Sequence, residues 1–152
     1  MIKRIKKVES SKRSLYQVFI GCLTKNGKKS VARKIVDHAL DTASNTLNLT
    51  PTQVLALVAS KIGSVLEVRE VKVLENQVYV PRMITRERQQ FVIVRTILSA
   101  LTEGNVNAPM SEKLGVEFVN ILKDKPCKTL SKSAQFKNLI KENRSNAHFR
   151  WV

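Results

Sequence analysis

The sequence predicts a mainly α-helical single domain of about six helices, with a two-stranded β-ribbon inserted at about 66–84. Three observations favour this class. Apolar residues recur at helical spacing along most of the chain, and one stretch rich in Val, Glu and Arg interrupts them. A chain of 152 residues with 43% hydrophobic content can form one core. The longest aliphatic run, 54–59, is far below the ~20 residues of a membrane span, so a transmembrane protein is excluded. No predicted helix pairs a Lys-rich face with a Trp/Phe-rich face, so no membrane partner is expected.

The first three helices are predicted over about 15–23, 28–47 and 51–62. The first two have apolar residues three and four positions apart, and Asn26-Gly27 separates them. Both residues tolerate the left-handed conformation that ends helices. Residues 50–53, Thr-Pro-Thr-Gln, have the pattern of a capping box with proline at the first helical position. This is the clearest helix start in the chain.

The ribbon is predicted to turn at Glu75-Asn76. Val68 and Val71 are out of phase for simple alternation between two faces, so either a bulge lies near Arg69-Glu70 or one strand begins later. Three more helices are expected after the ribbon. The first begins at Thr85 or Arg86 and ends at Gly104. The second covers about 109–123, and the third runs from after Pro126 to about Asn146.

Charge is the strongest functional signal. The chain has 27 Lys and Arg against 12 Asp and Glu, a formal net charge of +15, whereas a small domain typically has about 2–8. Such a surplus is best explained by a polyanionic partner, and nucleic acid is the obvious one. Residues 1–13 form a basic arm before the helical domain at 14–152. The cations of the arm are Lys3, Arg4, Lys6, Lys7, Lys12 and Arg13.

No pattern indicates an enzyme, a cofactor or a metal site. Residues 21–30, GCLTKNGKKS, resemble a phosphate-binding loop, but five residues rather than four separate the glycines and no strand precedes them. Asp37, His38 and Asp41 lack a second histidine within helical reach. Cys22 and Cys127 are far apart, which gives no disulfide framework and fits a reducing compartment.

Two kinds of nucleic-acid-binding protein fit the pattern. Helix, turn, helix and basic hairpin also describe a winged-helix DNA-binding regulator, but the helix that begins after Thr50 is mostly aliphatic where base-reading residues are needed. The glycine and aromatic motifs of KH and RNA-recognition-motif domains are missing from the sequence. Binding of RNA through shape, phosphates and 2′-hydroxyls suits the composition better.

Two segments carry a family resemblance. Residues 26–36, NGKKSVARKIV, resemble the helix-joining GKKS-x-A-x-x-I-V motif of the small-subunit ribosomal protein seven family. Residues 143–151, NRSNAHFRW, are similar to the closing N-R-x-x-A-H-Y/F-R-W signature of that family. Between them, residues 79–81 and 86–90 with Arg95 stand where the family has its ribbon exit and basic helix start. Residues 74–76 replace the Gly-Gly ribbon tip of many relatives.

The resemblance implies a structural protein of the small ribosomal subunit. Such a protein binds the 3′ major (head) domain of small-subunit rRNA, nucleates head assembly, contacts other small-subunit proteins and lies near exit-site tRNA and mRNA. The RxRQQ and HFRW spellings look organellar, so a mitochondrial ribosome (matrix) and an organelle-encoded chain are expected, with bacterial cytoplasm or plastid as alternatives. The residues expected to bind RNA are Lys3, Arg4, Lys6, Lys7, Lys28, Lys29, Arg33, Arg69, Lys72, Arg82, Arg86, Arg88, Arg95, Arg144, His148, Arg150 and Trp151.

Overall fold

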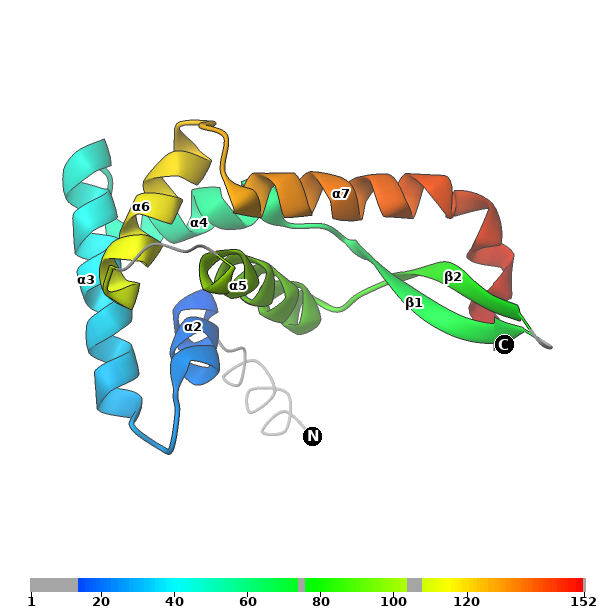
Figure 1. Cartoon of the computed structure of the whole chain (residues 1–152), viewed down its shortest axis with the longest axis horizontal. Helices are drawn as coiled ribbons and strands as arrows, with labels where there is room; N and C mark the ends of the chain where they lie inside the picture. Colours follow the sequence, from blue (N-terminus) through cyan, green and yellow to red (C-terminus); the bar gives the residue numbers. More distant parts are fainter. Residues whose placement is uncertain (1–13, 74–75, 104–107, 152) are drawn as a thin grey trace, which may run out of the picture.

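The computed structural model describes residues 14–73, 76–103 and 108–151. Over these ranges the chain forms six α-helices, a C-terminal 3₁₀ segment and one two-stranded antiparallel sheet (Figure 1). The elements are α2 (Leu15–Leu23), α3 (Lys29–Leu47), α4 (Pro51–Ile62), β1 (Leu66–Val73), β2 (Asn76–Met83), α5 (Arg86–Thr102), α6 (Met110–Leu122), α7 (Lys128–Glu142) and η1 (Arg144–Trp151). The predicted fold class, one helical domain with an inserted ribbon, is confirmed. The basic arm lies outside the described residues.

Local signals fix the starts of three helices. Thr50 forms the predicted capping box: its hydroxyl accepts from the Gln53 amide at 3.4 Å, and the Gln53 side chain accepts from the Thr50 amide at 3.1 Å. Ser14 forms a second capping box at the start of α2, and the Thr85 side chain caps α5. The predicted break between the first two helices is also confirmed, because Asn26 and Gly27 both have positive φ angles.

Side chains from all the α-helices except α7 form the fully buried core. Phe19 of α2 and Phe118 of α6 lie in its middle, with ring centroids 5.7 Å apart and planes at 90°. Helices α3 and α6 approach closely at Gly115, where an added Cβ would lie 3.2 Å from the Ala39 carbonyl oxygen. The described helices include none that is long and apolar enough to cross a membrane.

The ribbon is regular and β1 begins at Leu66, so both alternatives, a bulge near Arg69-Glu70 and a later strand start, were wrong. Pairing runs without interruption from Leu66 opposite Met83 to Val73 opposite Asn76, and Asn76 therefore belongs to β2 rather than to the turn. Apolar and polar residues do not alternate simply along the strands, because both faces of the ribbon are covered near the end that joins the helices. Val80 and Pro81 point to opposite faces and are both buried.

The last α-helix is shorter than predicted. It ends at Glu142 rather than near Asn146, and the chain continues as η1 against β2. The Asn143 side chain donates to the Leu139 carbonyl at 2.9 Å, while the Asn146 side chain donates to the Tyr79 carbonyl of β2 at 3.1 Å. Short asparagine side chains compete with helical hydrogen bonding in this way, and the second bond fixes the tail to the ribbon.

Candidate nucleic-acid interface

The start of α3 exposes the first group of predicted RNA-binding cations. Lys28, Lys29 and Arg33 are all exposed there. The first turn of this fully described helix has no acidic residue, and its N-cap, Lys28, makes no side-chain cap. The helix dipole and these cations therefore place positive charge at one point, where an external anion would be stabilised.

A contact between α2 and α3 holds this end of the molecule in place. The Tyr16 hydroxyl donates to an Asp37 carboxylate oxygen at 2.6 Å. This hydrogen bond is the main reason why the pKa of Tyr16 is raised, with burial adding to it. Asp37 therefore has a structural partner, and the described residues contain no group of three His, Cys, Asp or Glu side chains that could hold a metal ion.

The ribbon presents the second group. Arg69, Lys72 and Arg82 are all exposed. Arg82 is opposite Glu67 and Arg69 is two residues further along β1, so these two arginines share one face, while Lys72 lies on the other. The ribbon can therefore present cations on both sides.

Arg88 at the start of α5 has an intramolecular partner. Its Nε and Nη2 atoms donate to the two carboxylate oxygens of Glu67 at 3.0 and 2.6 Å, and its guanidinium lies 5.5 Å from the centroid of the Phe91 ring. Hydrogen bonding from Arg88 holds the pKa of Glu67 below its usual value. This bidentate pair ties the ribbon root to α5, and an RNA contact by Arg88 stays a prediction.

Replacing Glu67 with glutamine is expected to lower the free energy of unfolding by about 1 kcal/mol at pH 7, since the pair is bidentate and the Glu67 side chain is only 13% exposed. Glu67 has a lowered pKa in the folded state, so the stabilisation is present above the unfolded-state value of about 4.3 and is lost as the pH falls through the folded-state value. Urea unfolding at neutral and acidic pH measures this difference. The Arg88→Gln variant is the control background, in which Glu67→Gln should cost little more. An equal cost in that background, or a cost independent of pH, would contradict the assignment.

Two other predicted residues of α5 are exposed. Arg86 lies in the first turn and Arg95 in the third, and neither makes an ion pair with another described residue. Phe91 has helical spacing to Val94 and Leu98, which predicts an inward-facing side chain, but Phe91 is 36% exposed. The inward face of α5 is centred instead on Ile93 and Ile97, and the ring of Phe91 lies under Arg88.

The C-terminal segment brings its predicted residues next to the ribbon. Arg144 is exposed, and the exposed His148 ring donates from Nδ1 to the Ser145 carbonyl oxygen at 2.8 Å. The same ring stacks at a tilt on Phe149, with centroids 3.9 Å apart. The backbones of Arg150 and Trp151 continue η1, but their side chains lie outside what the structure describes. Lys3, Arg4, Lys6 and Lys7 of the arm lie outside it as well.

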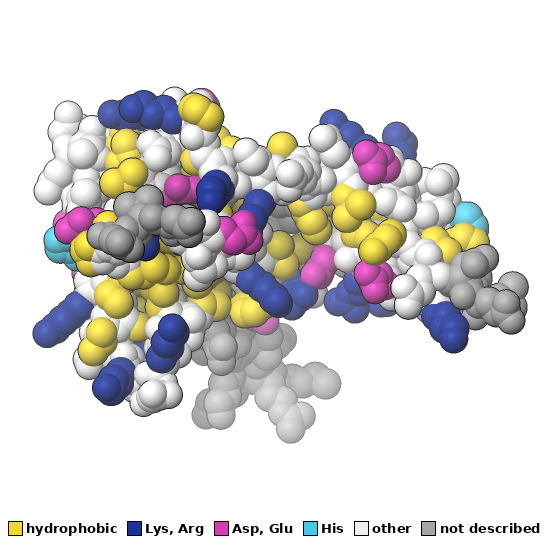
Figure 2. Space-filling model, in the orientation of Figure 1, with side chains coloured by type: hydrophobic (Ala, Val, Ile, Leu, Met, Phe, Trp, Pro, Cys, Tyr) yellow, Lys and Arg dark blue, Asp and Glu magenta, His cyan; other side chains and the backbone are white. Residues whose placement is uncertain are grey.

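Most of the predicted residues that the structure describes form two groups at opposite ends of the molecule, and the three arginines of α5 lie between them. In Figure 1, α3 lies at the left, whereas the ribbon and η1 lie together at the right. Figure 2 shows Lys and Arg side chains in several separate groups along this face rather than in one pocket. A surface of this kind suits an extended polyanion, because each group can neutralise a different set of phosphates.

Other lysines serve the fold instead. Lys61 of α4 donates to the last carbonyls of α6, Ile121 at 3.1 Å and Leu122 at 2.9 Å, and to the Asp124 carboxylate at 2.7 Å. Cations that contact helix C-termini in this way stabilise the unpaired carbonyls. The charge surplus therefore overstates the number of cations that are available to a partner.

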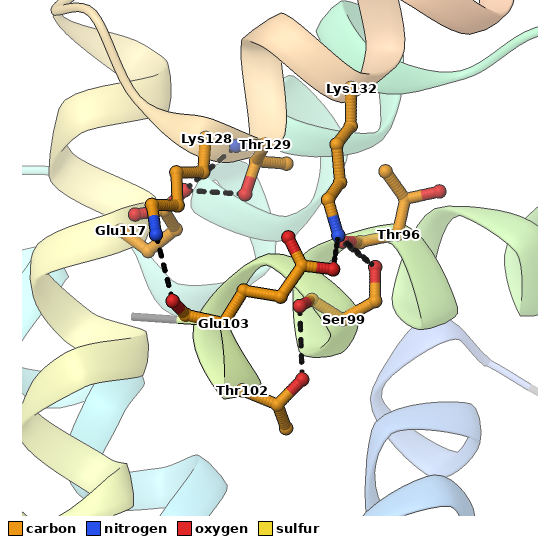
Figure 3. A network of polar contacts seen from close by, with 8 residues as sticks. All are labelled: Thr96, Ser99, Thr102, Glu103, Glu117, Lys128, Thr129 and Lys132. Carbon is orange, nitrogen blue, oxygen red and sulfur yellow. Dashed lines mark hydrogen bonds and ion pairs between the residues drawn. The ribbon is translucent and has the colours of Figure 1, made fainter. Parts of the chain in front are cut away.

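A second set of structural lysines lies between α5, α6 and α7 (Figure 3). Lys132 donates to the Ser99 hydroxyl at 3.1 Å and to the Glu103 carboxylate at 2.5 Å, while Lys128 donates to the Glu103 carbonyl at 2.8 Å. Beside them the buried Thr129 hydroxyl donates to Glu117. These bonds attach α7, which contributes little to the apolar core, to the rest of the helices.

A helical domain with a basic ribbon and dispersed exposed cations is typical of a structural nucleic-acid-binding protein. The family model described as Ribosomal protein S7p/S5e matches residues 2–144, and the chain belongs to that family. The match covers the helix-joining motif and ends at Arg144, so most of the closing signature lies beyond it. Membership in a family of ribosomal proteins identifies a structural, non-enzymatic protein and decides against the winged-helix alternative.

Several relatives carry the name "Small ribosomal subunit protein uS7". The protein of Dichelobacter nodosus is 29% identical over 133 residues, which is 88% of this chain and 84% of that protein. The protein of Thermosipho africanus is 31% identical over 126 residues, 83% of this chain and 80% of that protein. A relative from Reclinomonas americana, named "Small ribosomal subunit protein uS7m", is 26% identical over 133 residues, 88% of this chain and 82% of that protein.

Proposed function

We propose that this chain is a structural constituent of the small ribosomal subunit, where it binds the head domain of small-subunit rRNA and helps to nucleate its assembly. The observation that carries the proposal is the family match over residues 2–144, which fits the exposed cations at both ends of the molecule. The names of the relatives support the small subunit as the place of action.

The geometry suggests how such a protein organises RNA. The cations at the start of α3 and those of the ribbon and η1 would neutralise phosphates at two distant places, so that one rigid body holds two RNA segments together. The Glu67–Arg88 pair and the bond from Asn146 to the Tyr79 carbonyl oxygen fix the ribbon before RNA arrives. Preorganisation of this kind lowers the entropic cost of binding.

Further partners follow from the same proposal. Other small-subunit proteins would contact surfaces that the RNA leaves free, and the ribbon would lie near exit-site tRNA and mRNA. The ribbon tip, residues 74–75, lies outside the described residues. We propose a mitochondrial ribosome, supported by the RxRQQ and HFRW spellings and by the uS7m relative, with a bacterial or plastid ribosome as the alternative supported by the bacterial relatives.

A competition experiment tests the proposed function. Purified protein is mixed with a labelled transcript of the rRNA head domain, and unlabelled transcript or duplex DNA of equal length is added. The transcript should displace the label at least tenfold better than the DNA, and the logarithm of the binding constant should fall with the logarithm of the salt concentration by about 0.7–0.9 per neutralised phosphate. Equal or better competition by the DNA would contradict the proposal.

A further inference from the structure

A groove with an apolar floor runs between the ribbon and the C-terminal elements α7 and η1. Its volume is about 610 Å³. Leu66 and Met83, which are cross-strand partners, and Pro81 on the same ribbon face form one side of the floor. Ile140 of α7 and Ala147 of η1 form the other. These five residues are brought together from three separate parts of the chain.

The rim of this groove is cationic. Arg82, Lys141 and Arg144 line it, and every charged residue among its described lining is a cation. All three side chains are exposed, and none makes an ion pair with another described residue. The structural lysines described above bind carbonyls and carboxylates, so these three differ from them in having no such partner. The groove therefore combines an apolar surface with positive charge that a ligand can neutralise.

We propose that this groove binds one unstacked nucleotide of the RNA, with the base against the apolar floor and the flanking phosphates on the cationic rim. The inference rests on the proposed function and adds a binding subsite to it. Proteins recognise RNA mainly at loops and bulges, where unpaired bases are available for contact with apolar surfaces and guanidinium planes. The groove volume lies within the roughly 300–1,000 Å³ of small-molecule sites, so a single base can enter it.

The side chains of the groove suit a flat aromatic ligand. The Met83 side chain is 75% exposed at the groove edge, and thioether sulfur makes favourable contacts with aromatic rings. Arg82 is next to Met83 in β2 but its side chain leaves on the other ribbon face, so it adds positive charge near the rim rather than a surface for the base. An apolar peptide from a neighbouring protein would fill the floor but would leave three cations without a partner, and charge complementarity therefore favours the nucleotide.

Binding to three RNA duplexes of about 16 base pairs tests the proposal. One duplex is fully paired, one has a single bulged adenosine at its centre, and one has an abasic nucleotide in place of that adenosine. The abasic bulge keeps the backbone distortion and removes only the base. Measured by fluorescence anisotropy, the full-length protein should bind the bulged adenosine about five- to tenfold more tightly than the abasic bulge.

Two matched variants locate this preference. Met83→Ser should reduce it to less than about twofold, whereas Val65→Ser should leave it unchanged, because Val65 is also exposed, at 57%, but does not line the groove. Arg144→Gln should weaken binding to all three duplexes and make the salt slope shallower by about 0.7–0.9.

The results separate failure of the groove from failure of the proposed function. If all three duplexes bind with equal affinity and strong salt dependence, the proposed nucleotide subsite is wrong, while RNA binding by the protein stands. The same result is expected if the groove binds a peptide. A preference that survives in Met83→Ser also overturns the assignment to this groove. If none of the duplexes and no rRNA transcript binds, the proposed function fails and the groove inference fails with it.

Discussion

Replacing Phe118 with alanine is expected to lower the free energy of unfolding by about 3–5 kcal/mol. The Phe118 side chain is fully buried and makes an edge-to-face contact with Phe19, so truncation removes transfer free energy, an aromatic pair and close packing at once. Neighbouring helix backbones limit the collapse of the cavity. Because about 1 kcal/mol shifts the melting temperature of a domain of this size by roughly 2–4 °C, calorimetry should show a large decrease.

The matched control for this prediction is Phe91→Ala. Truncation of Phe91 to alanine removes the same number of atoms as truncation of Phe118, but Phe91 lies at the surface beside Arg88. Its loss should cost about 1 kcal/mol or less. Equal losses at the two positions would show that α6 does not contribute the centre of the core, and the described packing would then be wrong.

The double variant Lys28→Glu with Lys29→Glu is expected to change RNA binding and stability in opposite directions. Two cations that would contact phosphates become anions, so affinity for the head-domain transcript should fall about 10- to 100-fold at 0.1 M salt, with a salt slope shallower by about 1.4–1.8. The same change replaces positive by negative charge at the start of α3, whose first turn has no acidic residue. The free energy of unfolding should rise by about 1 kcal/mol.

Lys123→Glu with Lys125→Glu provides the control. These lysines are exposed and change the net charge equally, but they lie at and after the end of α6 and outside the predicted RNA-binding set. Affinity should fall much less, and stability should fall slightly, because anions at a helix C-terminus are unfavourable. If both double variants lost the same affinity, only total charge would matter, and the start of α3 would not be an RNA-binding surface.

Strong local signals explain why most of the fold was predictable. The capping box at Thr50, the Asn26-Gly27 break and the regular apolar spacing all act within a few residues, so the sequence reveals them directly. Two predictions that failed, a bulge in the ribbon and a longer α7, concern places where tertiary contacts decide the structure. Both ribbon faces are covered at Val80 and Pro81, so the hydrophobic pattern there looks irregular although the strand pairing is regular. The end of α7 depends on the hydrogen bond from Asn146 to β2, which joins residues 67 positions apart.

The predicted interface was recoverable only as a set of exposed cations. Charge pattern and family resemblance pointed to Lys28, Lys29 and Arg82, and the structure does expose them. The sequence could not show that Arg88 pairs with Glu67, 21 positions away, or that Lys61 binds the end of α6. It also missed the groove, because its lining comes from distant segments, although the exposed Met83 beside Arg82 is a local sign of it.

Sedimentation from the native source tests the central claim most directly. A lysate of the cells that make this protein is layered on a gradient in low and in high salt, and the fractions are probed for the chain. We expect it to migrate with small ribosomal subunits and to remain there after the high-salt wash that removes loosely bound proteins. Migration at the top of the gradient, free of ribosomal particles at both salt concentrations, would contradict a ribosomal role.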